Sequence, residues 1–285
     1  MPQCPSVRAE EIVFEGLWRR KLGASRAATL FEREGAEVVL GPTLRKLATA
    51  ATFNPSLPYL SFLCINFDAP VVKEAASWFL GGVFLNYNSS YLERALEQML
   101  DEDDSAEVTR FLRAVDVRID GFRVEKAPEG RGQRVFVKHE VDGRGYELRL
   151  SEESAGTQKL MGLAAFLLAA LERGGTVVVD ELDAKLHPKL LRYVILLFKD
   201  PEVNKHGAQL IFSSQDVFTM RNDVFRRDEI WFAARGEGEA SQLWSLADIH
   251  EANGNLVSKN AAFDKQYLSG RYGADPYLTR IEEWD

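Results

Sequence analysis

The stretch Thr176-Val-Val-Val-Asp180-Glu181 is a β-branched run that ends in two adjacent carboxylates. Such a run predicts a strand that is buried on both faces of a parallel sheet. Ligands of α/β sheets bind beyond the carboxyl ends of the strands, which is where these two acids stand. In phosphoryl transfer, Asp180 would bind Mg²⁺ and Glu181 would orient or deprotonate the attacking water. A strand end that is acidic without a function is the other interpretation of this pair.

A helix that precedes this strand is expected to begin at Ser154-Ala-Gly156-Thr157 and to stop at Gly174-Gly175. Ser154 suits the N-cap position, and Gly156 allows another backbone to approach closely. The free N–H groups of a helix N-terminus and a small hydroxyl group can meet phosphate oxygens. The helix is apolar nearly all round, so we expect it to be buried. A capped core helix without a ligand is the alternative.

The segments after the acidic pair continue an alternation of helices and buried strands, which predicts a mostly parallel α/β sheet. Leu182-Asp183-Ala-Lys-Leu-His187-Pro188 leads into a helix, and Ser213-Ser214-Gln215-Asp216 ends the next buried strand. Asp183 is expected to lie near the acidic pair, where it can bond across a subunit interface; a solvated loop acid is the alternative. His187, beside a proline, is more typical of a helix start than of a ligand.

Earlier parts of the chain predict other structures. Residues Glu11 to Val39 predict short strands joined by polar turns. Residues Tyr91 to Val115 have helical spacing around the acidic run Asp101-Glu-Asp-Asp104, which we expect to be a solvated loop. Three alternating stretches between Val117 and Leu150 predict an antiparallel meander. The region from Thr43 to about Tyr87 is apolar, and its aromatic residues are expected in the core: Phe62, Phe67, Trp78, Phe79, Phe84 and Tyr87.

Composition and charge exclude several classes of protein. The chain has 285 residues, 46% hydrophobic and 27% charged, which is typical of a globular protein with a sizeable core. A net charge of −8 gives no global basic field toward nucleic acid or an anionic membrane. Cys4 and Cys64 form no disulfide framework, no apolar run reaches the roughly 18 residues of a membrane span, and Met1 to Glu11 does not resemble a signal peptide. We therefore expect a cytoplasmic protein.

The order of these motifs resembles that of the ABC-type ATPases. The four that carry the resemblance are the Ser-x-Gly-Thr helix start, the Asp-Glu strand end, Leu-Asp-x-x-Leu-His-Pro and the Ser-Ser-Gln-Asp strand end. Within that superfamily the chain is similar to the AAA-type proteins of prokaryotic abortive-infection and phage-defence systems, which are relatives of the overcoming-lysogenization-defect and repair-ATPase heads. Further matches are Phe31-Glu-Arg-Glu34, Asp228-Glu-Ile-Trp231-Phe232 and the tail from Tyr267 to Pro276. The resemblance covers nearly the whole chain from about Glu11.

The resemblance implies ATP and Mg²⁺ as cofactors, with Asp180 as the metal ligand of a Walker B motif. Glu181 and Gln215 are the implied catalytic residues, and Gln215 stands at the switch position, where the family usually has histidine. A glutamine there can hydrogen-bond the γ-phosphate or water but cannot carry charge. The implied nucleotide contacts in the signature motif and the D-loop are Ser154, Gly156, Thr157 and Asp183. Such heads dimerise head to tail, so that the signature of one subunit closes over nucleotide held by the other.

No Walker A loop of the form G-x-x-x-x-G-K-[ST] occurs in the sequence. Gly41-Pro-Thr-Leu-Arg-Lys46 lacks the second glycine and the Ser/Thr, and Gly16 to Lys21 also departs from the pattern. That loop would supply the backbone N–H groups, the lysine and the magnesium-binding hydroxyl. We therefore expect a P-loop NTPase-like ABC ATPase head with a mostly parallel sheet, an antiparallel meander and a helical insertion, without the first strands and the Walker A loop.

We expect one ABC-type ATPase domain over residues 1–285 that lacks its N-terminal part. Within it, about 70–115 would be the helical insertion, about 150–250 the lobe with the signature, Walker B and switch residues, and about 251–285 a C-terminal tail. Two explanations for the absence of the Walker A loop stay open. The sequence is an N-terminally truncated version of a normal ATPase, or the protein itself has lost the loop.

The expected function is that of an ATP-binding and ATP-hydrolysing head in prokaryotic defence or nucleic-acid processing, inactive alone because Walker A is absent. The alternative is a catalytically incomplete binding module that completes the site of a partner ATPase in trans. The partner would be a second copy or a complete homologous ATPase; an effector nuclease or nucleic acid also fits the resemblance, and a membrane does not. A metal nuclease of the topoisomerase–primase type needs a strand-end glutamate and a later, separate Asp-x-Asp, which Asp180-Glu-Leu-Asp183 does not match.

Overall fold

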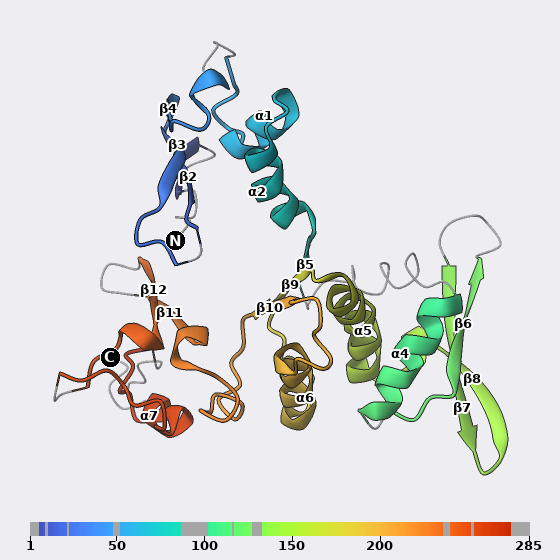
Figure 1. Cartoon of the computed structure of the whole chain (residues 1–285). Coiled ribbons are helices and arrows are strands. Elements are labelled where there is room, and N and C mark those ends of the chain that lie inside the picture. Colours follow the sequence, from blue (N-terminus) through green and yellow to red (C-terminus); the bar gives the residue numbers. More distant parts are fainter. Residues whose placement is uncertain are drawn as a thin grey trace, which may run out of the picture. The chain divides into compact units, whose positions relative to one another are not determined.

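The computed structural model describes residues 6–8, 11–21, 23–47, 52–86, 102–115, 117–126, 133–235, 240–251 and 254–274. Contacts divide the chain into two compact units, unit 1 (Met1–Gly81) and unit 2 (Gly82–Asp285). Figure 1 colours the chain from unit 1 in blue to the end of unit 2 in red. Compactness alone does not decide where a functional domain ends, so the single ATPase domain stays a prediction.

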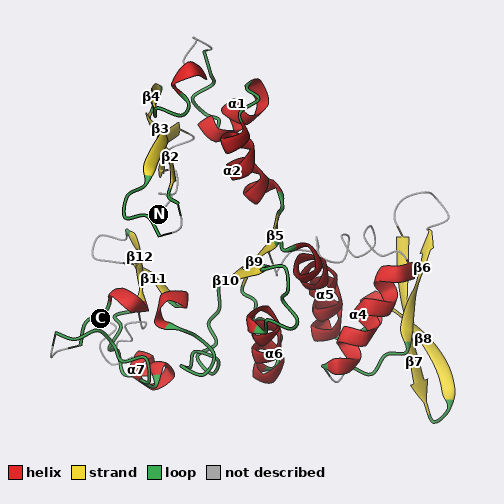
Figure 2. Cartoon of the chain, in the orientation of Figure 1, coloured by secondary structure: helices red, strands yellow, loops and turns green. Residues whose placement is uncertain are grey.

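Unit 1 combines an antiparallel sheet, of order β1-β2-β3-β4, with two helices (Figure 2). Its elements are β1 (Ser6–Arg8), β2 (Glu11–Arg19), β3 (Ala28–Glu34), β4 (Glu37–Leu40), the 3₁₀ turn η1 (Arg45–Leu47), α1 (Tyr59–Asn66) and α2 (Pro70–Leu80). Pro70 suits the first position of α2 because its missing N–H would have no partner within the helix there. The buried core of unit 1 consists of Leu30, Phe31, Leu44, Tyr59, Leu63, Ala69 and Val72.

A buried ion pair joins the sheet of unit 1 to the start of α1. The Arg33 side chain is fully buried and lies 3.4 Å from the Glu15 carboxylate. The Glu15 oxygens also accept the backbone N–H groups of Tyr59 at 2.6 Å and Leu60 at 3.0 Å. These are free N–H groups in the first turn of α1, whose N-cap Pro58 offers no side-chain oxygen. The pair therefore caps the helix from another part of the sequence.

Unit 2 begins with the strand that pairs with the predicted acidic strand. Its sheets are the parallel β10-β9-β5, the antiparallel meander β6-β7-β8 and the hairpin β11-β12. The strands are β5 (Gly82–Asn86), β6 (Gly121–Lys126), β7 (Gln133–Val141), β8 (Arg144–Arg149), β9 (Thr176–Asp180), β10 (Gln209–Phe212), β11 (Trp231–Arg235) and β12 (Ser241–Ser245). The helices are α4 (Glu102–Ala114), α5 (Ala155–Arg173), α6 (Pro188–Lys199) and α7 (Phe263–Leu268), with the 3₁₀ turns η2 (Leu150–Glu152), η3 (Arg227–Glu229) and η4 (Leu246–Asp248).

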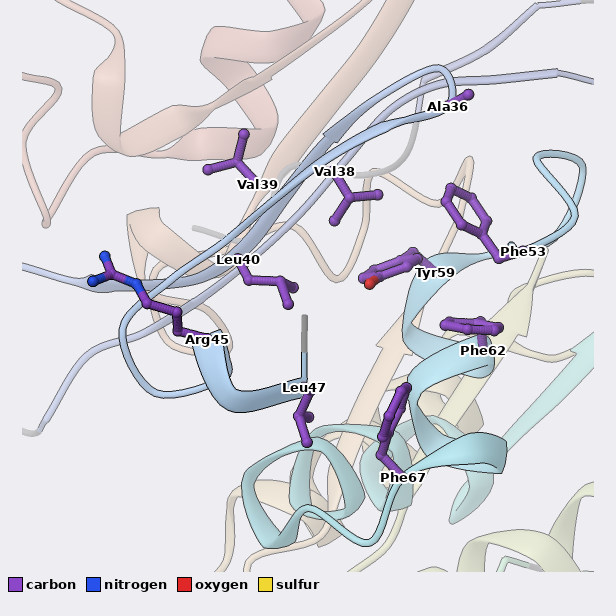
Figure 3. A pocket seen from close by; sticks show the side chains of 10 residues that line it. All are labelled: Ala36, Val38, Val39, Leu40, Arg45, Leu47, Phe53, Tyr59, Phe62 and Phe67. Atoms are coloured by element: carbon purple, nitrogen blue, oxygen red, sulfur yellow. The ribbon is translucent and has the colours of Figure 1, made fainter. Parts of the chain in front are cut away.

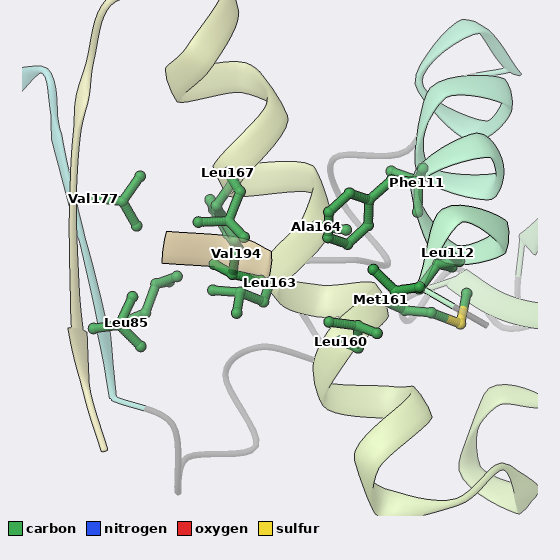
Figure 4. Close-up of a cluster of buried hydrophobic side chains, with 14 of the residues drawn as sticks. Leu85, Phe111, Leu112, Leu160, Met161, Leu163, Ala164, Leu167, Val177 and Val194 are labelled. Carbon is green, nitrogen blue, oxygen red and sulfur yellow. The ribbon is translucent and has the colours of Figure 1, made fainter. Parts of the chain in front are cut away.

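The parallel sheet buries one face against α5 and α6. Side chains alternate along each strand, and the residues that share this face are Val83, Leu85, Val177, Val179, Leu210 and Phe212. Figure 4 shows Val177 and Leu85 facing Leu163 and Leu167 of α5 and Val194 of α6. The same cluster continues to α4, which packs on α5, and to the meander. The large core predicted from the composition is therefore centred on α5.

Helix α5 has the boundaries that the sequence predicts. Ser154 is its N-cap and accepts a hydrogen bond from the Thr157 N–H, and Gly174 ends it with a φ of 76°, a left-handed conformation that favours glycine. A Cβ atom on Gly174 would stand 2.4 Å from the His206 carbonyl oxygen. The turn at the end of α5 therefore requires glycine at position 174.

The C-terminal part of unit 2 has a small core of its own. The hairpin β11-β12 packs against α7 and the residues around Tyr272. The Phe232 ring stacks on that of Tyr267, with centroids 5.7 Å apart, and lies 5.3 Å from that of Tyr272. Aromatic packing of this kind orders the segment that follows the last described strand.

Most predicted elements are confirmed, including the parallel core strands, the meander and the N-terminal strands. The parallel sheet has three strands, whereas the other described sheets are antiparallel, so antiparallel pairing is commoner than the sequence indicated. Within the expected helical insertion, β5 forms a strand of the core sheet.

Two further expectations were wrong. Glu102 to Asp104 form the first turn of α4 and not a loop, and Asp101 lies outside the described residues. Trp78, Phe79 and Phe84 are exposed, by 45%, 52% and 61% respectively, and not core. The rings of Trp78 and Phe79 in α2 pack against each other, with their centroids 4.9 Å apart. Side chains alternate along β5, so Phe84 lies on the face opposite the core. Phe62 and Phe67 pack on the core of unit 1 as predicted, and Tyr87 lies outside the described residues.

Candidate functional site

Two neighbouring parallel strands bring the predicted acidic pair next to a serine. Val179 of β9 is in register with Phe212 of β10, so the residues that follow them, Asp180 and Ser213, end side by side. The Ser213 hydroxyl donates to the Asp180 carboxylate at 2.5 Å and accepts the Glu181 N–H at 2.8 Å. The hydroxyl group thus fixes both the carboxylate of one acid and the backbone of the other.

Glu181 has an unusual backbone conformation for a residue with a side chain. Its φ is 53°, in the left-handed region, which costs a residue with a Cβ atom about 1–2 kcal/mol. The Ala184 N–H donates to the Glu181 carbonyl at 3.0 Å, so the chain turns sharply after the strand. Non-glycine residues in this region are enriched at functional sites, where surrounding contacts hold them.

The loop after the acidic pair is bonded to the end of β10. The Gln215 N–H lies 3.3 Å from both oxygens of the Asp183 carboxylate. The side chain of Gln215 is exposed. Asp183 therefore positions the backbone at Gln215 within the chain, beside the acidic pair. His187 is the N-cap of α6 and accepts the Lys189 N–H at 3.2 Å, as expected for a helix start.

The first turn of α5 lies against the same loop. A Cβ atom on Gly156 would stand 3.2 Å from the Lys185 carbonyl oxygen, a close approach that only glycine permits without adjustment. Ser154 is exposed, and its hydroxyl group is 2.9 Å from that of Thr157. The predicted signature residues and the predicted acidic loop are therefore neighbours in the fold.

Lys159 of α5 brings a further amino group into this region, one that was not among the predicted site residues. Its Nζ atom is buried, and burial together with the nearby Lys185 lowers its pKa from the ordinary 10.5 to about 8, while Glu181 acts in the opposite direction. A buried lysine beside a strand-end carboxylate is typical of functional sites. The signal for it in the sequence is a lysine in an otherwise apolar helix.

The donor set decides what kind of metal the site could hold. In the described part of the chain, no group of three or more His, Cys, Asp or Glu side chains could form a metal site. Mg²⁺ does not need such a cage, because it is commonly bound through one or two carboxylates, water and substrate phosphates. The exposed carboxylate of Asp180 fits that mode of binding.

The seven predicted site residues thus fall into two groups. One group gathers at the ends of β9 and β10 and comprises Asp180, Glu181, Asp183 and Gln215. The other is the first turn of α5, with Ser154, Gly156 and Thr157. Ser213 and Lys159 are the additions. Ser213 could have been inferred from its place directly after the neighbouring strand.

A separate hollow lies in unit 1 and contains none of these residues. Its volume is about 420 Å³, and its lining is apolar and aromatic except for Arg45 (Figure 3). Val38 and Leu40 of β4 line it together with Tyr59 and Phe62 of α1. Among the described residues that line it, Arg45 carries the one charged side chain and Tyr59 a hydroxyl group.

Comparison with known proteins identifies the family. A family model described as "AAA domain, putative AbiEii toxin, Type IV TA system" matches residues 43–221, which include all seven predicted site residues. Comparison with curated proteins found no match. None of the helices among the described residues has the length and apolar character that a membrane crossing needs. Because the match extends over well more than half of the chain, the protein belongs to this family of nucleotide-binding, ATPase-like AAA domains.

Proposed function

We propose that the chain is an ATP-binding and ATP-hydrolysing head of the ABC type that closes as a head-to-tail dimer. The observation that carries the proposal is the meeting of Asp180 and Glu181 with Ser213 at the carboxyl ends of two adjacent parallel strands. Ligands of parallel sheets bind at this edge. The family match supports nucleotide as the ligand and an abortive-infection or toxin–antitoxin setting for the activity.

The chain's own residues divide the work of hydrolysis. Asp180 would hold Mg²⁺, which when bound neutralises phosphate charge. Glu181 would accept a proton from water as the water oxygen forms a bond to the γ-phosphorus and the bond to the ADP oxygen breaks. Gln215 would hydrogen-bond the γ-phosphate or the water. Asp183 supports this arrangement by holding the Gln215 backbone.

The first turn of α5 would act on nucleotide held by the other subunit. Ser154 with the N–H groups around Gly156 and Thr157 forms a helix N-terminus, which favours anions. The exposure of Ser154 supports a contact with a group from outside the chain. A second candidate function follows from the same exposure, together with the absence of a G-x-x-x-x-G-K-[ST] loop from the sequence. In it the chain is a binding module that lends this turn to a complete partner ATPase.

Several further parts of the proposal share its basis. We infer one ATPase domain over 1–285 with a cytoplasmic location, and a second copy or a complete homologue as the dimer partner. Prokaryotic defence against phage is the proposed setting, with an effector nuclease or nucleic acid as a further partner. The family match supports the defence setting. Whether the chain dimerises is the first test of the proposed head-to-tail arrangement.

Hydrolysis assays on two preparations separate the candidates. In the first, the chain is mixed with a complete homologue that carries its own Walker A loop. In the second, an upstream segment with that loop is joined to the chain. Phosphate release from ATP and Mg²⁺ is measured for wild type, Glu181→Gln and Ser154→Arg. Glu172→Gln is the matched control, because Glu172 is exposed near the far end of α5.

The ATPase proposal expects Glu181→Gln to lower turnover of the joined protein by about 10²-fold or more, with nucleotide binding retained, because a positioned base is lost. If the chain is a binding module, Glu181→Gln should still stimulate the homologue. Ser154→Arg should not, because the long arginine side chain fills the position of the phosphate. The cap change itself costs only about 0.5–2 kcal/mol. Near-full turnover of the joined Glu181→Gln protein would assign Glu181 a structural role. Equal stimulation by wild type and Ser154→Arg would reject the binding module.

A further inference from the structure

The antiparallel sheet of unit 1 is basic at one end and acidic at the other. Between Glu15 and Glu32 the sequence contains four basic residues and no acidic one. All four are exposed, at the end of β2 and in the loop that leads to β3: Arg19, Arg20, Lys21 and Arg26. Glu34 and Glu37 are exposed at the opposite end, where the chain turns from β3 to β4. A chain with a net charge of −8 therefore presents concentrated positive charge on one hairpin.

The basic end of this sheet is a ribbon of two strands. In the described residues, β1 pairs with β2 as far as Phe14, and β4 pairs with β3 as far as Phe31. Beyond these points the sheet consists of β2 and β3, which stay paired up to Arg19 and Ala28. The basic residues therefore lie on a hairpin that extends past its neighbouring strands.

Side-chain and backbone contacts order this hairpin. The Trp18 indole N–H donates to the Glu32 carboxylate at 2.9 Å, from one strand to the other. The Trp18 ring also covers Gly16, where a Cβ atom would collide with it. In the loop, the Ala24 N–H donates to the Lys21 carbonyl oxygen at 3.0 Å. The basic side chains are thus carried by an ordered backbone, which lowers the entropy cost of binding a partner.

One of the four basic residues is paired within the chain. Arg19 lies 3.3 Å from the Glu74 carboxylate of α2, and both side chains are more than half exposed. Exposed ion pairs of this kind are weak. Arg20, Lys21 and Arg26 form no ion pair with another described residue. Three cations of the hairpin are therefore available to an anionic partner, and Arg19 becomes a fourth when it leaves Glu74.

The shape and chemistry of the hairpin favour duplex DNA over other anionic partners. The major groove of B-form DNA admits a two-stranded β-ribbon, and exposed arginine and lysine side chains bind its phosphates. The major groove of A-form RNA is too narrow for side chains to enter. Binding to a membrane surface relies on apolar and aromatic side chains that enter the lipid. Trp18, which precedes Arg19, is instead half-buried and bonded to Glu32.

We propose that the β2–β3 hairpin binds the phosphate backbone of duplex DNA from the major groove, through Arg20, Lys21 and Arg26. The proposal rests on the part of the proposed function that includes a nucleic-acid partner, and it involves neither ATP nor the acidic pair. The contacts are to phosphates and not to base edges, so binding is independent of DNA sequence. Binding weakens with salt, because each phosphate contact releases counterions.

The first measurement is the salt dependence of DNA binding by the full chain. Fluorescence anisotropy of a labelled DNA duplex of mixed sequence gives the association constant between about 20 and about 100 mM salt. Each phosphate contact contributes about −0.9 to the slope of log K against log salt concentration. Replacing Arg20, Lys21 and Arg26 together by glutamine should therefore make the slope shallower by about 2.7 and lower the affinity near 20 mM salt at least about ten-fold.

The matched control replaces Arg144, Lys205 and Lys259 together by glutamine. These are exposed basic residues of unit 2, so the control changes the net charge by the same amount away from the hairpin. Its slope should equal that of wild type. Circular dichroism of both triple variants shows whether the fold is retained.

A second variant tests the hairpin by a gain of binding, which a loss of folding cannot produce. Glu74→Gln removes the carboxylate that pairs with Arg19 and leaves that cation to the DNA. The affinity near 20 mM salt should rise about three-fold or more, and the slope should steepen by up to about 0.9. Glu107→Gln is the matched control, because Glu107 is an exposed glutamate of α4 in unit 2.

The outcomes separate this inference from the proposed ATPase reaction. A slope that is unchanged in the folded triple variant of the hairpin, or equally changed in its control, overturns the inference. So does Glu74→Gln binding no tighter than wild type. Equal binding of an RNA duplex overturns the assignment to DNA, and binding of vesicles with anionic phospholipids but not of DNA assigns the hairpin to a membrane. Wild type that binds no duplex at about 20 mM salt also rejects the inference, and the hydrolysis assays still decide the ATPase proposal.

Discussion

Replacing Lys159 with methionine is expected to stabilise unit 2 at neutral pH. The Nζ atom of Lys159 is buried, and desolvation is the largest cause of its lowered pKa. Methionine keeps an unbranched stem of similar length and carries no charge, so it removes the cost of burying the ammonium group. The attraction to Glu181 is lost as well, but it is the smallest of the three contributions to the pKa of Lys159. The net effect should be a more stable protein.

The magnitude follows from the pKa. The fall from 10.5 to about 8 corresponds to at most about 3.4 kcal/mol, at about 1.4 kcal/mol for each pKa unit. The residue as a whole is partly exposed, and water along its stem screens part of this cost. We therefore expect Lys159→Met to raise the free energy of unfolding by about 1–2 kcal/mol near pH 7.

The gain should depend on pH in a definite direction. The folded pKa of Lys159 is lower than the unfolded one, so between about pH 8 and about pH 10.5 the unfolded chain binds a proton that the folded chain does not. The contribution of Lys159 to wild-type stability should therefore rise with pH through this window. Below about pH 8 both states are protonated and the full penalty is present. The advantage of the methionine variant should be greatest there and shrink toward about pH 10.5.

Urea unfolding followed by circular dichroism, at several pH values from about 7 to about 10.5, measures both quantities. Lys205→Met is the matched control, because Lys205 is exposed in unit 2 and its replacement should change stability by less than about 0.5 kcal/mol. A methionine variant less stable than wild type near pH 7 refutes the reasoning. So does a stability difference that is constant across the pH window.

Two further predictions concern the scaffold. Arg33→Met should destabilise unit 1 by about 3–5 kcal/mol, because it leaves the Glu15 carboxylate buried without its cation. Limited proteolysis and circular dichroism measure this loss. An unchanged proteolysis pattern would count against a structural role for the pair. Gly174→Ala should lower the melting temperature much more than Gly207→Ala. Both glycines have a positive φ, but only at Gly174 would the new Cβ atom stand 2.4 Å from the His206 carbonyl oxygen. Equal losses of melting temperature would mean that the backbone conformation, and not the close contact, determines the cost.

The sequence predicted those parts of the fold that local patterns encode. The β-branched run of β9, the N-cap Ser154 and the terminating Gly174 each have a local physical cause, and all three are found where they were expected. Strand β5 was missed because the apolar region that contains it was interpreted as a whole and was not divided at Gly81-Gly82. Its identity as a strand depends on pairing with β9, which is far away in sequence.

The candidate site was predicted as a set of residues but not as an arrangement. Strand ends and a helix cap can be read from the sequence, so Asp180, Glu181 and Ser154 were identified as candidates. The role of Ser213 depends on which strand lies next to β9 and in which register. Lys159 depends on which side of α5 faces the loop after β9. The sequence can mark Ser213 and Lys159 as candidates, but what each side chain contacts depends on tertiary packing.

Strand register is the property on which the chemistry of this site depends most. A slip of one residue between β9 and β10 would turn the Ser213 hydroxyl toward the opposite face, because the side chains of a strand alternate. The Glu181 N–H would then lose its acceptor at 2.8 Å, and with it the contact that helps to hold a left-handed residue at the strand end. The slip is opposed by the core itself, since Val177 and Val179 are fully buried on one face against α5 and α6. The packing that stabilises unit 2 therefore also places the Ser213 hydroxyl between the carboxylate of Asp180 and the backbone N–H of Glu181.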